Sequence, residues 1–303
     1  MNFFPMTRIL GFAVLLTCCG LPAAGAAAGE AASAASEAAP TRATATLLVR
    51  GDRLFLPVRL NGKETRNALL DSGAELSLVD AGFARHAGLA MAGTETARGT
   101  GGEDEVSFAH GVTIEAAGIV LEDRTVAVLD LGPIAARVVG WPLSLVVGRE
   151  LFDAARLFID IETATLAAVP RDGEPAGQRL AMQTHKGLQT IPVTVEGGQP
   201  VQADFDLGNG NEVLIGAAYA ERAGLLAPGR VTGQKSGGGI GGEVVRDLVV
   251  LKALEVAGVT FNDIPAAIDR TDTAADVNIG VRILRNFRIT ADFAENAVWL
   301  EPR

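Results

Sequence analysis

The chain has 303 residues, enough for one large domain or two ordinary ones. Apolar residues make up 48% of it and charged residues 20%, which excludes intrinsic disorder along the whole chain. The net charge of −10 without basic clusters argues against nucleic acid as a partner, because phosphate binding depends on Lys and Arg. With 36 glycines, 13 prolines and 5% aromatic residues, the composition indicates a turn-rich chain, more β than helical.

The first segment has the features of a targeting sequence. Arg8 supplies a positive charge, residues 9–21 are uncharged and too few to span a bilayer, and residues 24–26 form a small-residue cleavage site. We therefore expect an exported protein, periplasmic or secreted, from which a signal peptide of residues 1–26 is removed.

Both cysteines of the chain, Cys18 and Cys19, lie inside this segment. The mature chain would then have no disulfide, no thiol nucleophile and no Cys-ligated metal. The residues around the two cysteines also match, imperfectly, a bacterial lipoprotein signal; this alternative would leave a lipid anchor, and only then would the protein meet a membrane. Residues 27–44 are alanine-rich and offer no apolar face beyond methyl groups, so we expect a flexible linker there.

A repeat organises the rest of the chain. Five matches follow in the same order with offsets between 132 and 140, and the three clearest are PVRLNG at 57–62 with PVTVEG at 192–197, DSG at 71–73 with DLG at 206–208, and FARHAGL at 83–89 with YAERAGL at 219–225. Any one of these matches is weak, but their common order indicates a duplication. We expect two homologous lobes, residues 45–172 and 173–303, each of domain size.

The same order of elements is predicted in each lobe. In the first, alternating apolar residues predict a strand over residues 53–60, which turns at Asn61-Gly62 into a second strand over residues 65–70. A short helix begins at the N-cap Asp80 and ends at Gly88. The elements expected after it are a glycine-rich hairpin over residues 98–106, a short helix over residues 149–155, and closing strands over residues 157–161 and 165–169.

The tripeptide Asp71-Ser72-Gly73 follows an apolar segment and precedes Ala74. By itself such a tripeptide is a turn. Together with the glycine-rich hairpin about 30 residues later and with Val146-Val147-Gly148, it resembles the retropepsin-like aspartic protease family. The resemblance covers nearly all of the expected mature chain, once per lobe, so the arrangement is similar to the two-lobed pepsin type.

The resemblance implies a mostly β fold of two barrel-like lobes related by a pseudo-twofold axis. It implies an aspartic endopeptidase in which Asp71 and Asp206 share a proton and activate one water, because two carboxyl groups so close together do not both ionise. Such a hydrolase acts as a monomer on a peptide or protein substrate, and needs no metal, cofactor or covalent intermediate.

The resemblance also implies which residues surround a bound peptide. The glycine hairpins would be flaps that bond to the backbone of an extended peptide, and Ser72 and the loop glycines would lie against it. The expected substrate-binding residues are Ser72, Gly73, Gly101, Gly102, Gly208, Gly241 and Gly242.

The second lobe departs from the family pattern. Leu207 stands where members of the family have a Ser or Thr whose hydroxyl bonds to the opposite loop, so Ser72 can supply one half of this contact and Leu207 cannot supply the other. Residues 209–211 also add one residue after the motif. Two alternatives therefore stay open: a non-catalytic peptide-binding protein of the same fold, and an enzyme formed by a dimer of the first lobe, in which Asp206 is dispensable.

Other motifs lead to no function. The G-x-G-x-x-G at residues 237–242 is followed by a strand pattern and not by a helix, and residues 204–215 lack the glycine and glutamate of a calcium loop. The three histidines form no metal motif. Asp160 and Asp292 match each other in the closing strands, where we expect a structural role.

Overall fold

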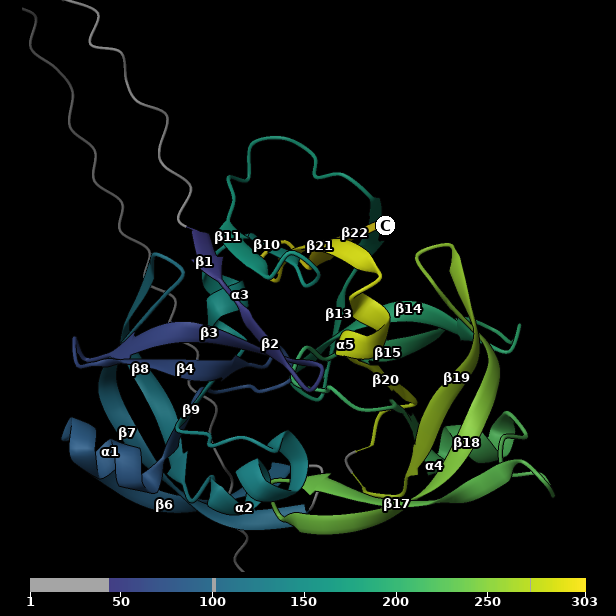
Figure 1. The fold of residues 1–303 in the computed structure, drawn as a ribbon, viewed down its shortest axis with the longest axis horizontal. Coiled ribbons are helices and arrows are strands. Elements are labelled where there is room, and N and C mark those ends of the chain that lie inside the picture. Colours follow the sequence, from purple (N-terminus) through teal and green to yellow (C-terminus); the bar gives the residue numbers. More distant parts are fainter. Residues whose placement is uncertain (1–43, 100–101, 273) are drawn as a thin grey trace, which may run out of the picture. The chain divides into compact units, whose positions relative to one another are not determined.

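The structure is a computed structural model that describes residues 44–99, 102–272 and 274–303. The expected signal peptide, and all of the alanine-rich linker but Thr44, lie outside the described residues. Strands dominate the described part of the chain and form three sheets (Figure 1). The mostly β fold class expected from the sequence is confirmed.

Lobe one is built on an eight-stranded sheet with the order β2-β3-β4-β9-β5-β8-β7-β6. Its strands are β2 (Leu48–Arg50), β3 (Arg53–Leu60), β4 (Thr65–Leu70), β5 (Leu78–Asp80), β6 (Met91–Gly99), β7 (Gly102–Ala116), β8 (Ile119–Leu129) and β9 (Leu145–Val147). The predicted strands 53–60 and 65–70 are confirmed with their bounds.

Lobe two is built on a second eight-stranded sheet with the order β13-β14-β15-β20-β16-β19-β18-β17. Its strands are β13 (Gln183–His185), β14 (Leu188–Val195), β15 (Val201–Phe205), β16 (Val213–Gly216), β17 (Val231–Gly239), β18 (Gly242–Val256), β19 (Val259–Asp269) and β20 (Val277–Ile279). Strand for strand, the order repeats that of lobe one, including the extra pairing of β14 with β18, which matches that of β3 with β7. The duplication read from the sequence is therefore a duplication of topology.

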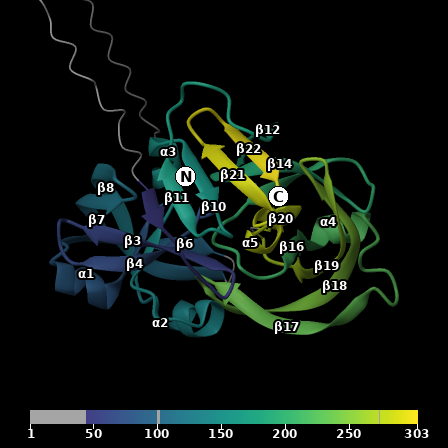
Figure 2. The same cartoon turned by 45° about the horizontal axis from the view of Figure 1, so that its top comes forward.

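A six-stranded sheet joins the lobes, with the order β1-β11-β10-β21-β22-β12. Its strands are β1 (Thr44–Thr46), β10 (Leu157–Asp160), β11 (Thr165–Ala168), β12 (Gln178–Ala181), β21 (Phe287–Asp292) and β22 (Ala297–Pro302). The central pair is antiparallel, with Leu157 opposite Ala291 and Ile159 opposite Ile289. Figures 1 and 2 show β10 and β21 side by side, where the halves of the chain exchange backbone hydrogen bonds. The sequence did not predict this joint sheet.

The helices are short. They are α1 (Ala81–Ala87), α2 (Gly132–Ile134), the π-helical segment η1 (Ala135–Val139), α3 (Glu150–Ala154), α4 (Ala217–Arg222) and α5 (Val281–Leu284). The predicted caps of α1 are confirmed: the Asp80 carboxylate accepts from the N–H groups of Gly82 and Phe83, and Gly88 is left-handed with φ of 72°. Among the described residues, no helix has the length and apolar character that crossing a bilayer requires.

Strands with alternating buried and exposed side chains contribute the residues of the core. Strand β3 shows why its bounds were predictable, since its side chains become alternately buried and exposed toward the Asn61-Gly62 turn, where both φ values are positive. The main apolar cluster runs through both lobes and the joint sheet, and Phe205, Phe152 and Phe287 are among its largest buried side chains. A separate, smaller cluster lies in lobe one.

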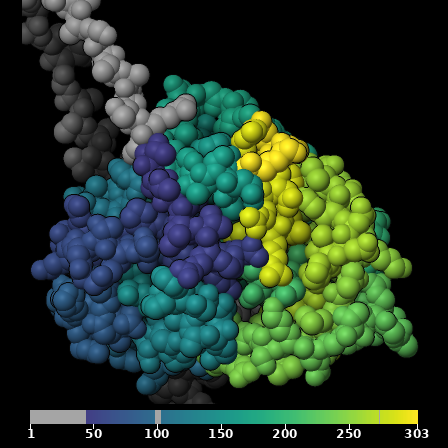
Figure 3. Space-filling model, viewed as in Figure 1, coloured from purple at the N-terminus to yellow at the C-terminus, as the bar shows by residue number. Residues whose placement is uncertain are grey.

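Ion pairs also connect the halves of the chain. The Asp52 carboxylate, in the turn between β2 and β3, lies 3.1 Å from Arg282 and 2.6 Å from Arg285, which come from the α5 region. In Figure 3 this purple segment of lobe one lies against the yellow segment near the C-terminus. Asp292 is completely buried and pairs with Arg156 and Arg171, so its contacts are structural.

Candidate active site

Equivalent loops carry Asp71 and Asp206. Each loop follows an inner strand, β4 or β15, that runs parallel to a second inner strand, β9 or β20. The Asp71 N–H donates to Val147 O at 3.0 Å, and the Asp206 N–H donates to Ile279 O at the same distance. The two loops therefore leave their sheets through equivalent hydrogen bonds. Each lobe contributes one carboxyl group to the same site.

The two carboxyl groups meet between the lobes. They are in hydrogen-bond contact with each other, and each accepts the N–H of the glycine two residues on, Gly73 or Gly208, at 2.9 Å. A Cβ on Gly73 would lie 3.0 Å from Asp206 Cγ, and one on Gly208 would overlap the Asp71 carboxyl group. The approach of the opposite acid therefore requires a glycine at position 208 and leaves little room for a side chain at position 73.

The surroundings of the acids differ. Asp206 accepts from the N–H groups of Gly208 and Asn209, and from the Asn278 side chain at 2.8 Å. Burial and then the charge of Asp206 raise the pKa of Asp71 to about 7. Three donors bond to the oxygens of Asp206, whereas the raised pKa of Asp71 favours its protonated form.

Ser72 connects the two loops. Its hydroxyl donates to Phe205 O at 2.8 Å and accepts from the Leu207 N–H at 2.9 Å. The side chain is 1% exposed and does not line the cavity around the acids, so the expectation that Ser72 contacts substrate does not fit the structure. Leu207, at the equivalent position, is completely buried in the main core and has no hydroxyl to return the contact.

Arg53 is a site residue that sequence reasoning missed. It is 3% exposed, and its guanidinium donates to Gly208 O, beside Asp206, and to Val138 O at 3.1 Å. Burial lowers the pKa of Arg53, against the attraction of Asp206 and Asp71. The duplication offered a signal, because Arg53 matches Leu188 of lobe two: a cation stands where the repeat has an apolar residue.

A cavity of about 730 Å³ opens over the two acids. Its walls come from both lobes, and Asp71, Gly73, Asp206 and Gly208 lie on its surface. The volume lies within the range typical of small-molecule and peptide-side-chain sites. The acids are therefore reachable from a space able to hold several residues of a peptide.

Comparison with known proteins shows which family the chain is similar to. The family model described as aspartyl protease matches the chain twice, at residues 56–143 and 191–283, which together are well over half of its length. The chain belongs to this family. Each match spans one Asp loop and its hairpin, so the internal duplication is confirmed at the level of the family as well. Among curated proteins no match to the chain is found.

The hairpins of this aspartyl protease family member reach the cavity with different residues from those expected. Thr96 and Ala97 line it from β6, and residues 235–240 line it from β17 and the turn that follows. Gly241 and Gly242 do not line it, which corrects the expectation for these two glycines. Gly101 lies outside the described residues, and Gly102 begins β7.

The lobe-two hairpin also crosses to lobe one. The Arg137 guanidinium in η1 donates to Gly239 O at 3.1 Å, and Ile240 packs against the small apolar cluster of lobe one. The turn between β17 and β18 thus bridges the lobes beside the cavity. The sequence predicted a hairpin here but not what it contacts.

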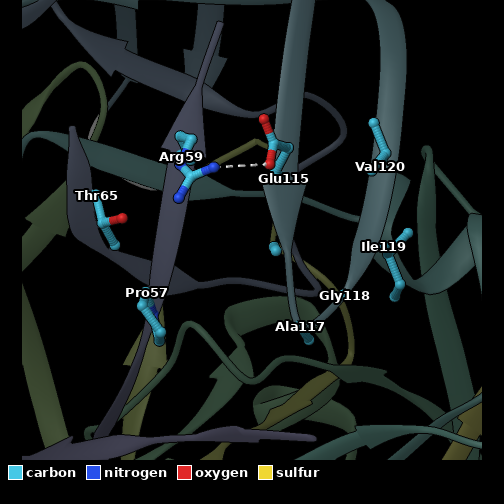
Figure 4. A pocket seen from close by; sticks show the side chains of 9 residues that line it. Pro57, Arg59, Thr65, Glu115, Ala117, Gly118, Ile119 and Val120 are labelled. Carbon is cyan, nitrogen blue, oxygen red and sulfur yellow. Dashed lines mark hydrogen bonds and ion pairs between the residues drawn. The ribbon is translucent and has the colours of Figure 1, made fainter. Parts of the chain in front are cut away.

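A second hollow, of about 260 Å³, lies on lobe one and shares no lining residue with the cavity over the acids (Figure 4). Its one acid, Glu115, faces Arg59 at 3.4 Å. With no second acid in its lining, this hollow offers no chemistry comparable with that of the paired aspartates.

Proposed function

We propose that this protein is an aspartic endopeptidase in which Asp71 and Asp206 activate a water to hydrolyse a peptide bond. The observation that carries the proposal is the contact of these two carboxyl groups at the surface of a shared cavity. Membership of the aspartyl protease family supports peptide hydrolysis as the reaction.

The asymmetry of the acids supports one assignment of roles. Asp206, held as a carboxylate by its donors, takes a proton from the water as the water oxygen attacks the carbonyl carbon. Asp71 donates its proton to the carbonyl oxygen, which forms a neutral tetrahedral diol. The C–N bond then breaks as the leaving nitrogen takes the proton from Asp206 and a diol hydroxyl returns its proton to Asp71.

The walls of the cavity support an extended peptide as the substrate. Two strand hairpins, β6/β7 and β17/β18, reach the cavity and present backbone groups, and an extended chain recognises such edges by adding its own backbone hydrogen bonds. We further propose Gly73 and Gly208 as contacts of the substrate backbone, because both line the cavity beside the acids.

The test replaces each acid by its amide. Asp71→Asn and Asp206→Asn should each reduce the cleavage of a denatured protein, measured between pH 3 and pH 8, by at least about 1,000-fold, because neither amide exchanges a proton. Asp123→Asn and Asp263→Asn are matched controls, since both residues are exposed, occupy equivalent positive-φ positions of β8 and β19 and lie outside the cavity lining. Full activity of Asp71→Asn would reject the proposal, and full activity of Asp206→Asn alone would favour a dimer of lobe one.

One observation favours a second candidate function. Because Leu207 contributes no hydroxyl, only one of the two equivalent side chains, Ser72, bonds to the opposite loop. A misplacement of about 1 Å is enough to cost about 100-fold in rate. Peptide binding without turnover, seen as saturable binding of a labelled peptide to a chain that cleaves no protein, would identify a non-catalytic peptide-binding protein.

A further inference from the structure

The duplicated registers make the halves of the cavity comparable residue by residue. Leu69 lies opposite Val146 in lobe one as Asp204 lies opposite Asn278 in lobe two. In the outer strands, Val106 of β7 pairs with Glu95 as Arg246 of β18 pairs with Lys235. At three equivalent positions of the cavity wall, lobe one therefore has Leu69, Val106 and Val146 where lobe two has Asp204, Arg246 and Asn278.

At these three positions the lobe-one half is apolar. Leu69, Val106 and Val146 belong to the small cluster of lobe one, and all three are at most 5% exposed. The apolar cavity wall continues with Leu131, Ile134, Val139 and Leu143. A large apolar side chain is the ligand that such a wall stabilises, because apolar surface gains free energy when it is removed from water.

The lobe-two half is charged, but most of its charges are paired. Arg246 lies 3.1 Å from Asp269, and both are less than 10% exposed. The other Asp269 oxygen accepts from the N–H and the hydroxyl of Thr271. Glu212 faces Lys235 at 2.8 Å. Each of these charges therefore has a partner of opposite sign within the protein.

Asp204 is the exception. Its side chain is 7% exposed, lines the cavity, and has an oxygen, Oδ1, that is buried without a hydrogen-bond partner. Two residues before Asp206 on β15, it points to the same face of the sheet as that acid. The groups that face it are Asp206, the Asn278 side chain and Lys186, which is exposed. Burial and then the charge of Asp206 raise the pKa of Asp204 to about 7.

A buried carboxyl oxygen without a donor is costly, and a positively charged group is its strongest complement. We propose that the lobe-two half of the cavity binds a Lys or Arg side chain of the substrate through Asp204, while the lobe-one half binds a large apolar side chain on the other side of the scissile bond. This specificity rests on the proposed peptidase function, and it makes Asp204 a specificity-determining residue distinct from the catalytic pair.

The test begins with a peptide library whose cut positions are read by mass spectrometry. Cleaved bonds should have Lys or Arg on one side and a large apolar residue on the other. A peptide chosen from this set is then compared with its analogue in which norleucine replaces the Lys, so that only the charged group is changed. The Lys peptide should have the higher kcat/KM by about 10- to 100-fold, the size expected for a charge-assisted hydrogen bond.

Substitution of Asp204 locates the preference. Asp204→Asn, and Asp204→Leu, which copies Leu69 of lobe one, should reduce the Lys-to-norleucine ratio of kcat/KM toward one, while Asp263→Asn leaves it unchanged. In the unsubstituted protein the ratio should be larger at pH 8 than at pH 5, because Asp204 is ionised only above its raised pKa. Any effect of the catalytic pair on rate cancels in this ratio.

The outcomes separate the two proposals. Cleavage of both peptides with equal kcat/KM, or an unchanged ratio in both Asp204 variants, overturns the specificity and leaves the peptidase function standing. If no peptide of the library is cleaved, the peptidase function fails. The ratio of the dissociation constants of a Lys peptide and its norleucine analogue, measured by fluorescence anisotropy, then still tests whether Asp204 selects a cation. Equal or undetectable binding would then overturn the specificity as well.

Discussion

The two Asp loops share a backbone path and differ in what holds them in place. Both leave their sheets through the same hydrogen bond and both use a glycine to admit the opposite acid. In lobe one the next side chain, Ser72, bonds to the other loop, whereas in lobe two Leu207 packs into the core. A duplicated site thus keeps its geometry while one copy secures it by hydrogen bonds and the other by burial.

Substitution of Gly73 and Gly208 tests directly whether the two loops depend equally on the missing side chain. In Gly208→Ala the added methyl group would overlap the Asp71 carboxyl group, and kcat should fall by about 100-fold or more as the acids are pushed apart. In Gly73→Ala the methyl group meets Asp206 Cγ at 3.0 Å, and the loss should be smaller, about 10-fold.

Kinetics on the same denatured protein substrate measure both variants. Gly233→Ala is the control, because a Cβ there meets nothing within 4 Å. Equal losses in the two loop variants would mean that the contact between the acids is more symmetric than the structure indicates. No loss in Gly208→Ala would mean that the acids do not need to touch.

Removal of the Ser72 hydroxyl tests how much its hydrogen bonds contribute to stability and activity. Ser72→Ala leaves Phe205 O and the Leu207 N–H buried without a partner, so the free energy of unfolding should fall by about 2–4 kcal/mol. The activity should fall about 10-fold, because the loops are no longer connected through a side chain. Urea denaturation and kcat measure the two effects.

A conservative variant separates the hydroxyl from the packing. Ser72→Thr keeps both hydrogen bonds and should retain most of the stability and activity. Should Ser72→Ala retain full stability, the contact would be dispensable, and burial of Leu207 alone would position the lobe-two loop.

The sequence predicted the parts of the fold that depend on local pattern. Strands β3 and β4 follow alternation and the Asn61-Gly62 turn, and α1 follows its two caps. The joint sheet was not predicted, because β10 and β21 pair across more than one hundred residues and nothing local in either strand specifies its partner.

The candidate site shows the same division. The repeat singled out Asp71 and Asp206, and the structure brings them together. The family resemblance implied that the Ser72 hydroxyl bonds to the opposite loop, and it does so; its additional assignment as a substrate contact does not fit its burial between the loops. Asp204 was considered only as part of a calcium loop; its match to Leu69 was the signal, and only the register of β15 with β20 shows that it faces the cavity.

Substitution of Arg53 should have the smallest effect on activity. It reports on the electrostatics of Asp71 and Asp206. In the proposed mechanism Asp71 must carry a proton, so activity should be lost as the pH rises through its raised pKa of about 7. The charge of Arg53 lowers that pKa, against the larger effects of burial and of Asp206. Arg53→Met should therefore raise the pKa of Asp71. The alkaline limb of the kcat/KM profile should move to higher pH, by less than about one pH unit.

A shift of the alkaline limb separates two effects of Arg53: its charge acting on the pKa of Asp71, and its hydrogen bonds supporting the lobe-two loop. Arg53→Met also removes the hydrogen bonds to Gly208 O and Val138 O, which should lower kcat at every pH without moving the limb. Arg53→Lys keeps a positive charge and should hold the limb near its original position, and Arg59→Met, exposed on the same strand, is the control. A limb that stays in place in Arg53→Met would show that this arginine only braces the lobe-two loop, leaving Asp206 and burial to set the protonation of Asp71.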